Sequence, residues 1–173
     1  MRIHSSVLAV AFLVSGCASP ITHPIGRTVR RPGSEPEYFN VKEKDAEMDR
    51  AVRLARKHVR VFITALEHPA PGQVDFEVKK PFVQGDTVEH IWLAHVRYSG
   101  KRFHGLVDNR PQEIKGLKMG TRVSVNPNEI SDWLFVDNGK LVGGYTIRVL
   151  YKDLPPDRKK EFETQADFKI EPH

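Results

Sequence analysis

Apolar residues recur at alternating intervals of four and three between Val41 and Leu66, which is the period of one face of an α-helix. Basic residues fall on the opposite side, and acidic residues crowd the first turns, as the helix dipole favours. Asn40 with Glu43 fits an N-terminal capping signal, and His68-Pro69 ends the segment. The pattern predicts one long amphipathic helix with the apolar stripe Met48, Val52, Ala55, Val59, Phe62 and Leu66 and the basic stripe Arg50, Arg53, Lys57 and Arg60. That basic stripe is either a solvated face or a partner-binding face.

After Pro71-Gly72 the period shortens to the alternation of β-strands. Strands are predicted over residues 74–80, 88–98, 101–108, the end of 116–125, 131–136 and 141–142. Asn138-Gly139 is a strong hairpin signal between the last two. Thr146 to Leu154 is interpreted as a helix capped by Thr146, and residues 157–166 as a second helical segment. The expected fold is α+β: a long N-terminal helix packed on an antiparallel, strongly bent sheet or partial barrel of five to six strands, with short C-terminal helices.

The hairpin around Ser99-Gly100 is the most informative stretch. A two-residue loop at Ser99-Gly100 places Trp92, Ala94, Val96 and Tyr98 on one apolar face, taken as core. On the other face it sets Arg97 opposite Arg102 and His95 opposite His104. Such a histidine pair can share a metal or respond to pH, but two histidines are too few for a structural zinc site. A slip of one residue in the loop removes the pair.

The N-terminus has the layout of an export signal. Met1 to His4 is a short basic region, Val7 to Val14 is apolar, and small residues precede Cys17. This order resembles the lipobox of bacterial lipoproteins, which implies removal of residues 1–16 and lipidation of Cys17. The resemblance further implies the outer membrane of a Gram-negative bacterium, facing the periplasm, because Ala18 rather than Asp follows the cysteine. Residues 17–40 are then a lipidated, proline-rich flexible tether and residues 41–170 a single domain.

Charge and cysteine usage narrow the classes of partner. Cys17 is the only cysteine, so once lipidated it leaves no thiol for disulfides, metals or catalysis. Removing Arg2 with the leader leaves 26 basic against 22 acidic side chains, from the 27 and 22 of the whole chain. This modest positive excess favours an anionic surface or an acidic protein partner, and the expected compartment argues against nucleic acid.

Several short motifs follow one another in a specific order: Phe76-x-Val78-Lys79-x-Pro81-Phe82, Glu89-His90-Ile91-Trp92-Leu93, Phe103-x-Gly105, Asn109-x-Pro111, Leu117-Lys118-x-Gly120, Ile130-Ser131-Asp132-Trp133 and Gly143-Gly144-Tyr145-Thr146-Ile147-Arg148. Together they resemble the YegJ-like family of bacterial proteins, a domain of unknown function, over roughly Met48 to Leu154. The resemblance implies a small α+β domain found in secreted and lipid-anchored forms. The resemblance implies no established activity for this chain.

No established catalytic motif is present. Should a catalytic site exist, Glu89, His90 and Asp132 are its candidates for acid/base chemistry, with Trp92 and Trp133 as a stacking wall. A structural interpretation competes, in which the tryptophans anchor the core and both carboxylates bind backbone N–H groups.

These observations favour a lipid-anchored, periplasm-facing binding or interaction domain that is not an enzyme and needs no metal or cofactor. Its expected binding residues are Trp92, His95, Arg97, Lys101, Arg102, His104 and Trp133. One alternative is an immunity or inhibitor lipoprotein that inserts the tip around Arg97, Lys101 and Arg102 into the acidic cleft of a periplasmic toxin or lytic enzyme. A second alternative is a hydrolase-type enzyme using Glu89, His90 and Asp132.

Overall fold

The computed structural model describes residues 41–166 and 168–171 of the 173-residue chain, with side chains from residue 46 onward. The predicted signal peptide, Cys17 and the tether lie outside the described residues. The described elements are α1 (Val41–Lys57), α2 (Val59–Glu67), β1 (Gln73–Gln84), β2 (Thr87–Ser99), β3 (Arg102–Val107), β4 (Arg122–Val125), β5 (Asp132–Asp137), β6 (Lys140–Gly143), α3 (Tyr145–Lys152) and α4 (Pro156–Ala166). This composition confirms the α+β class. Within these residues no helix is long and apolar enough to cross a membrane.

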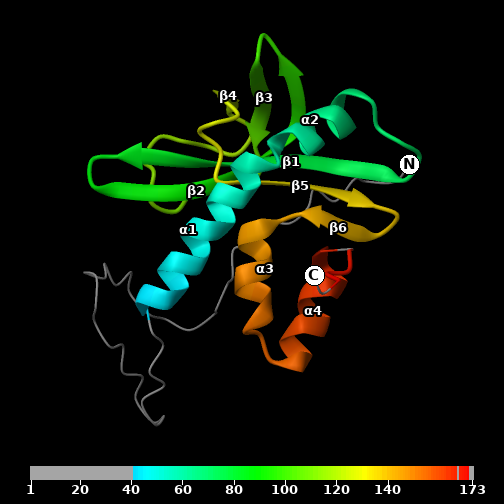
Figure 1. Ribbon diagram of the computed structural model, residues 1–173. Helices are drawn as coiled ribbons and strands as arrows, with labels where there is room; N and C mark the ends of the chain where they lie inside the picture. The colour runs from blue at the N-terminus through cyan, green and yellow to red at the C-terminus, as the bar shows by residue number, and fades with distance from the viewer. Residues whose placement is uncertain (1–40, 167, 172–173) are drawn as a thin grey trace.

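The six strands form one open antiparallel sheet in the order β4-β3-β2-β1-β5-β6. β1 and β2 pair with each other only from Val78 opposite Leu93 to the turn at Gln84 and Thr87. Beyond that row, β1 continues against β5 and β2 continues against β3, so the sheet divides into two arms (Figure 1). Because β4 and β6 remain separate edges, the strongly bent sheet or partial barrel expected from the sequence is wrong.

The predicted single helix over residues 41–66 is also wrong, because it is divided into α1 and α2 at His58. There the backbone leaves helical geometry, with φ −99° and ψ 9°, and the His58 carbonyl accepts from Val61 three residues ahead. The His58 ring nitrogen Nδ1 lies 2.9 Å from the Tyr145 hydroxyl, so a contact from α3 accompanies the break. The apolar stripe nevertheless continues across it, since Ala55, Val59 and Phe62 are all buried.

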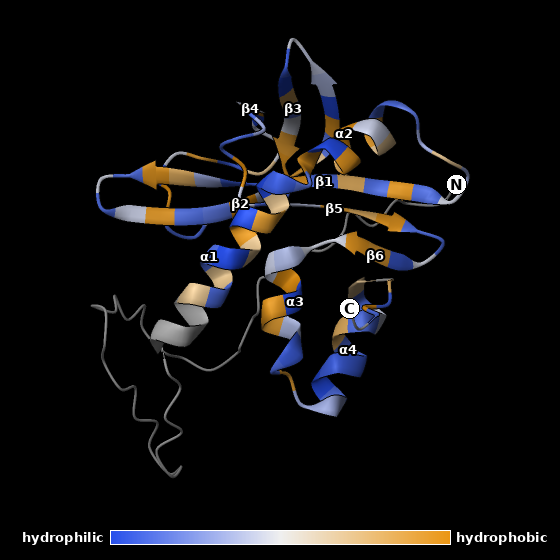
Figure 2. Ribbon diagram, in the orientation of Figure 1, coloured by the Kyte–Doolittle hydropathy of each residue, from blue (hydrophilic) through white to orange (hydrophobic). Residues whose placement is uncertain are grey.

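The main core lies between these two helices and one face of the sheet. Phe62 is fully buried at its centre, with its ring centroid 5.5 Å from that of Phe103 and 5.4 Å from that of Trp133. The indole N–H of Trp133 donates to the Ala55 carbonyl at 2.7 Å, which ties β5 to α1. β3 and β5 contribute Phe103, Val107, Trp133 and Phe135 to this core, and both strands carry orange apolar positions in Figure 2.

A second apolar cluster covers the opposite face of the β5–β6 arm. Leu134, Val136 and Leu141 pack there against Phe162 and Ala166 of α4, with Phe168 beside them. The two predicted C-terminal helices are confirmed as α3 and α4.

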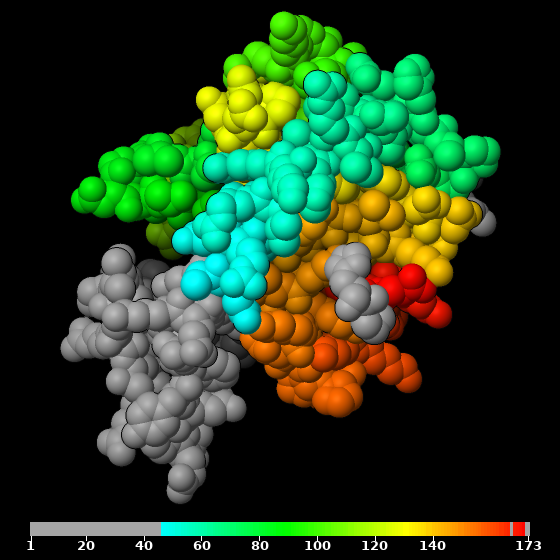
Figure 3. Space-filling model, viewed as in Figure 1, coloured from blue at the N-terminus to red at the C-terminus, as the bar shows by residue number. Residues whose placement is uncertain are grey.

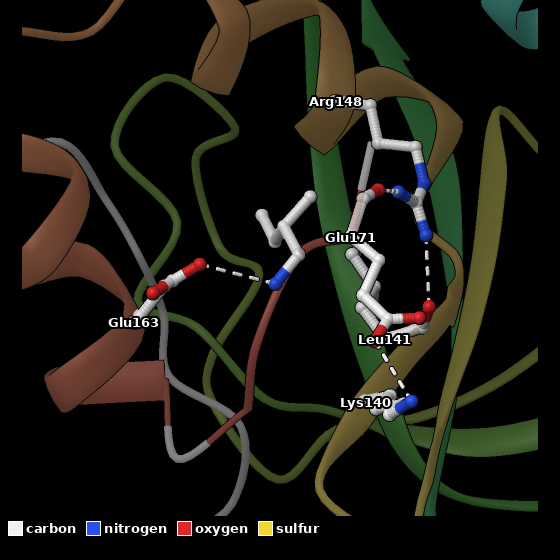
Figure 4. Close-up of polar contacts among 6 residues, drawn as sticks. Lys140, Leu141, Arg148, Glu163 and Glu171 are labelled. Carbon is white, nitrogen blue, oxygen red and sulfur yellow. Dashed lines mark hydrogen bonds and ion pairs between the residues drawn. The ribbon is translucent and has the colours of Figure 1, made fainter. Parts of the chain in front are cut away.

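The chain beyond α4 is held against β6 by backbone and side-chain contacts. Leu141 donates its N–H to the Lys169 carbonyl, so the tail lies along the edge of the sheet. Arg148 donates to the carbonyls of Leu141 and Glu171, at 2.8 and 2.9 Å, and Lys140 pairs with Glu171 (Figure 4). These contacts cover the β6 edge and leave β4 as the other edge of the sheet.

Candidate functional site

An open hollow lies on the β2–β3–β4 arm, on the sheet face away from α1 and α2. Its orientation follows from strand alternation: Val123 and Val125 of β4 face the main core, so Arg122 and Ser124 face the other way. The pairing sets His104 between Arg97 and Ser124 and sets Leu106 beside Arg122. The hollow has a volume of about 820 Å³ and is lined by His95, Arg97, Tyr98, Ser99, His104, Gly105, Leu106, Arg122, Val123 and Ser124.

The lining of this basic hollow carries arginine and histidine side chains and no acidic one. Arg97 and Arg122 are exposed. Arg102 lies at its border, where its Nε donates to the Ser124 hydroxyl at 2.7 Å and stiffens the edge strand. Two exposed guanidinium groups around hydroxyl and imidazole groups suit a carboxylate or another oxyanion, since arginine binds such groups through paired N–H donors.

The structure brings His95 and His104 to the same hollow but not opposite each other. The turn is Gly100-Lys101, with φ 56° and 60°, so Ser99 lies opposite Arg102, one residue away from the predicted loop. A β-bulge then sets His95 and Val96 together opposite Gly105, and His104 lies opposite Arg97. The predicted His95–His104 and Arg97–Arg102 pairings are therefore wrong. No group of three potential metal ligands occurs among the described residues.

The bulge also changes which residues of β2 reach the main core. His95 adopts φ 51°, a left-handed conformation uncommon for a side chain other than glycine. Past it, Leu93 and Ile91 are fully buried in the main core, while Trp92 is half-buried on the other face. The residues predicted to share one core face are therefore divided: Val96 is buried in the main core, Trp92 packs against the second apolar cluster, and Ala94 is buried outside the main cluster.

Glu89 accepts hydrogen bonds from three consecutive backbone amides. Oε1 accepts from Gln112 at 2.8 Å, and Oε2 accepts from Glu113 and Ile114 at 2.9 and 3.2 Å. These bonds fix the loop between β3 and β4 against β2. A structural role accounts for this carboxylate.

Asp132 is fully buried at the N-terminus of α3. Its Oδ1 accepts from the amides of Trp133 and Tyr145, and its Oδ2 accepts from the amide and hydroxyl of Thr146. Burial raises the pKa of Asp132, while the hydrogen bonds from Thr146 and Trp133 and the Lys79 ammonium act in the opposite direction. The carboxylate thus serves the unpaired N–H groups of the helix terminus, a cap supplied by β5 rather than by Thr146 as the sequence suggested.

The other candidate residues lie apart from the hollow. His90 keeps part of its surface exposed on β2, opposite Pro81. Partial desolvation, followed by the charges of Lys79 and Arg56, lowers its pKa. Trp133 is buried, and the Lys79 ammonium lies 5.4 Å from the ring centroid of Trp92. Lys101 is exposed at the hairpin tip.

Two residues of interest did not stand out in the sequence. Arg122 precedes the alternating Val123 and Val125, which signals an outward side chain, but only the β3–β4 pairing, which sets it opposite Leu106, brings it to the hollow that His104 also lines. Glu77 of β1 is 2% exposed, and among the described side chains its Oε2 is the buried atom without a hydrogen-bond partner. Desolvation, then the charges of Asp108 and Asp75, raises the pKa of Glu77 to about 9.

Comparison with known proteins adds a family. The family model described as "Uncharacterized protein conserved in bacteria (DUF2314)" matches residues 45–170. A putative ankyrin repeat protein of Neisseria meningitidis serogroup B is 31% identical over 133 residues, covering 72% of this chain and 53% of that protein, so the chain spans about half of its length. The uncharacterized protein YegJ of Escherichia coli K12 is 30% identical over 118 residues, covering 68% of this chain and 76% of YegJ. No solved structure matches this chain. The family match covers most of the chain and nearly all of its described residues, and the chain therefore belongs to the DUF2314 family.

Proposed function

We propose that this chain is a non-enzymatic binding domain that takes an acidic segment of a partner protein in the basic hollow. The observation that supports this proposal most directly is the lining of the hollow. It combines exposed Arg97 and Arg122 with His95 and His104 and contains no carboxylate. Complementary charge speeds association and disfavours partners of the same charge. The paired strands fix the backbone positions from which these side chains extend, so the backbone needs little ordering on binding.

The cellular location belongs to the same proposal. The leader and Cys17 support a lipid-anchored domain on the periplasmic face of the outer membrane. Residues 17–40 then serve as the tether between the anchor and the domain.

The test is photo-crosslinking with the full chain in its native envelope. A photoreactive residue replaces Ser99, which lines the hollow, and crosslinked peptides are identified by mass spectrometry. The expected product is one acidic peptide of one partner, lost in Arg97→Gln/Arg122→Gln. The control Arg110→Gln/Lys118→Gln removes the same charge from the loop between β3 and β4 and keeps the product. A product equally weak in both variants reflects net charge alone and contradicts the proposal.

A second candidate function rests on the shape of the β2–β3 hairpin. The hairpin projects at the top of Figure 1, and its tip is the tight turn Gly100-Lys101 between Ser99 and Arg102. A tight turn that carries basic side chains suits insertion into the acidic cleft of a toxin or lytic enzyme, as in an immunity or inhibitor lipoprotein. Inhibition of such an enzyme by the wild-type chain but not by Lys101→Glu supports this function. Unchanged toxin sensitivity after deletion of the gene contradicts it.

A further inference from the structure

A second basic surface lies on the opposite side of the molecule, along α1 and the start of α2. Four side chains, Arg50, Arg53, Lys57 and Arg60, are exposed and recur at spacings of three and four, so they share one face with exposed Ala46. We name these four residues the helical stripe. No acidic residue occurs between Arg50 and Leu66, although Asp49 lies beside the first turn of the stripe.

This face carries no other part of the described structure. α1 packs with its other sides on β5 and α3, where Ala51 and Ala55 are buried and Lys152 pairs with Glu47. Figure 3 shows α1 and α2 as an uninterrupted exposed ridge across the front of the molecule. Val61, 54% exposed, lies next to the stripe and adds an apolar side chain to it.

The helical stripe and the basic hollow point in opposite directions. α1 and α2 pack on the sheet face that holds Phe103 and Val125, and the hollow opens on the reverse face. A surface bound by the stripe therefore leaves the hollow free for a partner. The 23 residues 18–40 separate the predicted lipidation position, Cys17, from the start of α1 at Val41, so α1 is the first described element after the anchor.

We infer that the helical stripe docks the domain on anionic lipid headgroups and so turns the basic hollow away from the membrane. The inference rests on the proposed lipid-anchored location. A row of guanidinium and ammonium groups complements a negatively charged bilayer surface, which attracts basic side chains that lie close to the headgroups. The anchor removes most of the entropic cost of this contact, because the stripe stays close to the membrane in any case.

The experiment measures which face of the anchored domain lies against lipid. The acylated full chain is placed in vesicles, and a fluorophore is attached to a cysteine at Ala46, in line with the stripe, or at Ser99, in the hollow. Cys17 is the only native cysteine, and acylation occupies its thiol, so each variant has one free thiol. Quenching by a nitroxide on the lipid headgroup reports contact.

At Ala46 the inference predicts quenching in vesicles that contain phosphatidylglycerol, and loss of that quenching in pure phosphatidylcholine or in high salt. At Ser99 it predicts no quenching in any condition. Changing all four stripe residues to Gln, which keeps helix propensity, removes the quenching at Ala46. Equal quenching at both positions, or quenching at Ala46 that ignores anionic lipid, overturns the inference.

Whether Cys17 is lipidated, as the proposed location requires, is determined separately from the mass of the peptide that contains position 17. If Cys17 carries no lipid, the Cys17→Ser chain is floated with phosphatidylglycerol vesicles. Flotation of the wild-type stripe but not of the four-glutamine variant still supports the inference, and equal flotation overturns it. Neither result depends on Arg97 or Arg122, so the proposed function of the hollow is judged by its own crosslinking test.

Discussion

Asp132 Oδ2 accepts both the amide and the hydroxyl of Thr146, at 2.7 and 2.6 Å, inside a fully buried site that joins β5 to the first turn of α3. Because Oδ1 also accepts from Trp133 and Tyr145, removing the carboxylate leaves several donors at once without an acceptor. Asp132→Ala is expected to lower the free energy of unfolding by about 3 kcal/mol or more.

Urea unfolding followed by circular dichroism checks this value. Asp157→Ala, which removes an exposed carboxylate from the first turn of α4, is the control and is expected to cost no more than about 1 kcal/mol. A stable Asp132→Ala protein that has lost partner binding or turnover instead places Asp132 in a functional site.

Glu77 makes stability fall as pH rises. Its pKa is about 9 in the folded chain against 4.5 as the ordinary value, so the folded state keeps a proton that the unfolded state releases above pH 4.5. The resulting penalty grows from pH 4.5 to about 9 and amounts to roughly 3 kcal/mol by pH 7. Glu77→Gln, neutral at every pH, removes it.

The measurement is the difference in unfolding free energy between wild type and Glu77→Gln, taken at intervals from pH 5 to pH 9 because other groups contribute equally to both. The unfolding free energy of the variant relative to that of the wild type is expected to increase steadily as pH rises. Parallel curves for the two proteins show that Glu77 titrates normally, and they contradict this account of the site.

Substitutions at Gly143 and Gly139 distinguish the stability cost of backbone strain from the cost of steric overlap. Both adopt left-handed φ, 75° and 76°, but a Cβ at Gly143 overlaps the carbonyl and ring of Trp133, while one at Gly139 meets nothing. Gly139→Ala is expected to cost about 1 kcal/mol for the conformation alone. Gly143→Ala is expected to cost about 2 kcal/mol more, because β6 must move away from Trp133.

Thermal and urea unfolding of the two variants give this comparison directly. Tryptophan fluorescence adds a local readout, since Trp133 should shift in Gly143→Ala and remain unchanged in Gly139→Ala. Equal costs for the two substitutions are incompatible with tight packing of β6 on Trp133.

Periodicity predicted the elements of the fold better than their joins. Val123 and Val125 alternate, and Ala55, Val59 and Phe62 recur with the helical period, so strand and helix faces follow from local chemistry alone. The break at His58 has no glycine or proline to announce it. It accompanies a contact to Tyr145, a residue 87 positions away.

Prediction of the candidate site from the sequence is limited in the same way. The bulge at His95 shifts the alternation of β2 by one residue, which exchanges Trp92 for Leu93 in the main core and separates the expected histidine pair. A β-bulge depends on how neighbouring strands meet, here where β1 and β2 diverge, and no residue type in β2 marks it. Arg97 was a predicted binding residue, but Arg122, which lines the same hollow, is known to do so only from the β3–β4 pairing.

The most direct test of the basic hollow is a titration of the isotope-labelled full chain with a short polyglutamate peptide, followed by amide NMR shifts. The account predicts that the shifts concentrate on His95, Arg97, His104, Arg122 and Ser124 and weaken with salt. It also predicts that Arg97→Gln/Arg122→Gln abolishes them and Arg110→Gln/Lys118→Gln does not. Shifts centred on the helical stripe or on the loop between β3 and β4, with the hollow unaffected, would contradict the proposed function.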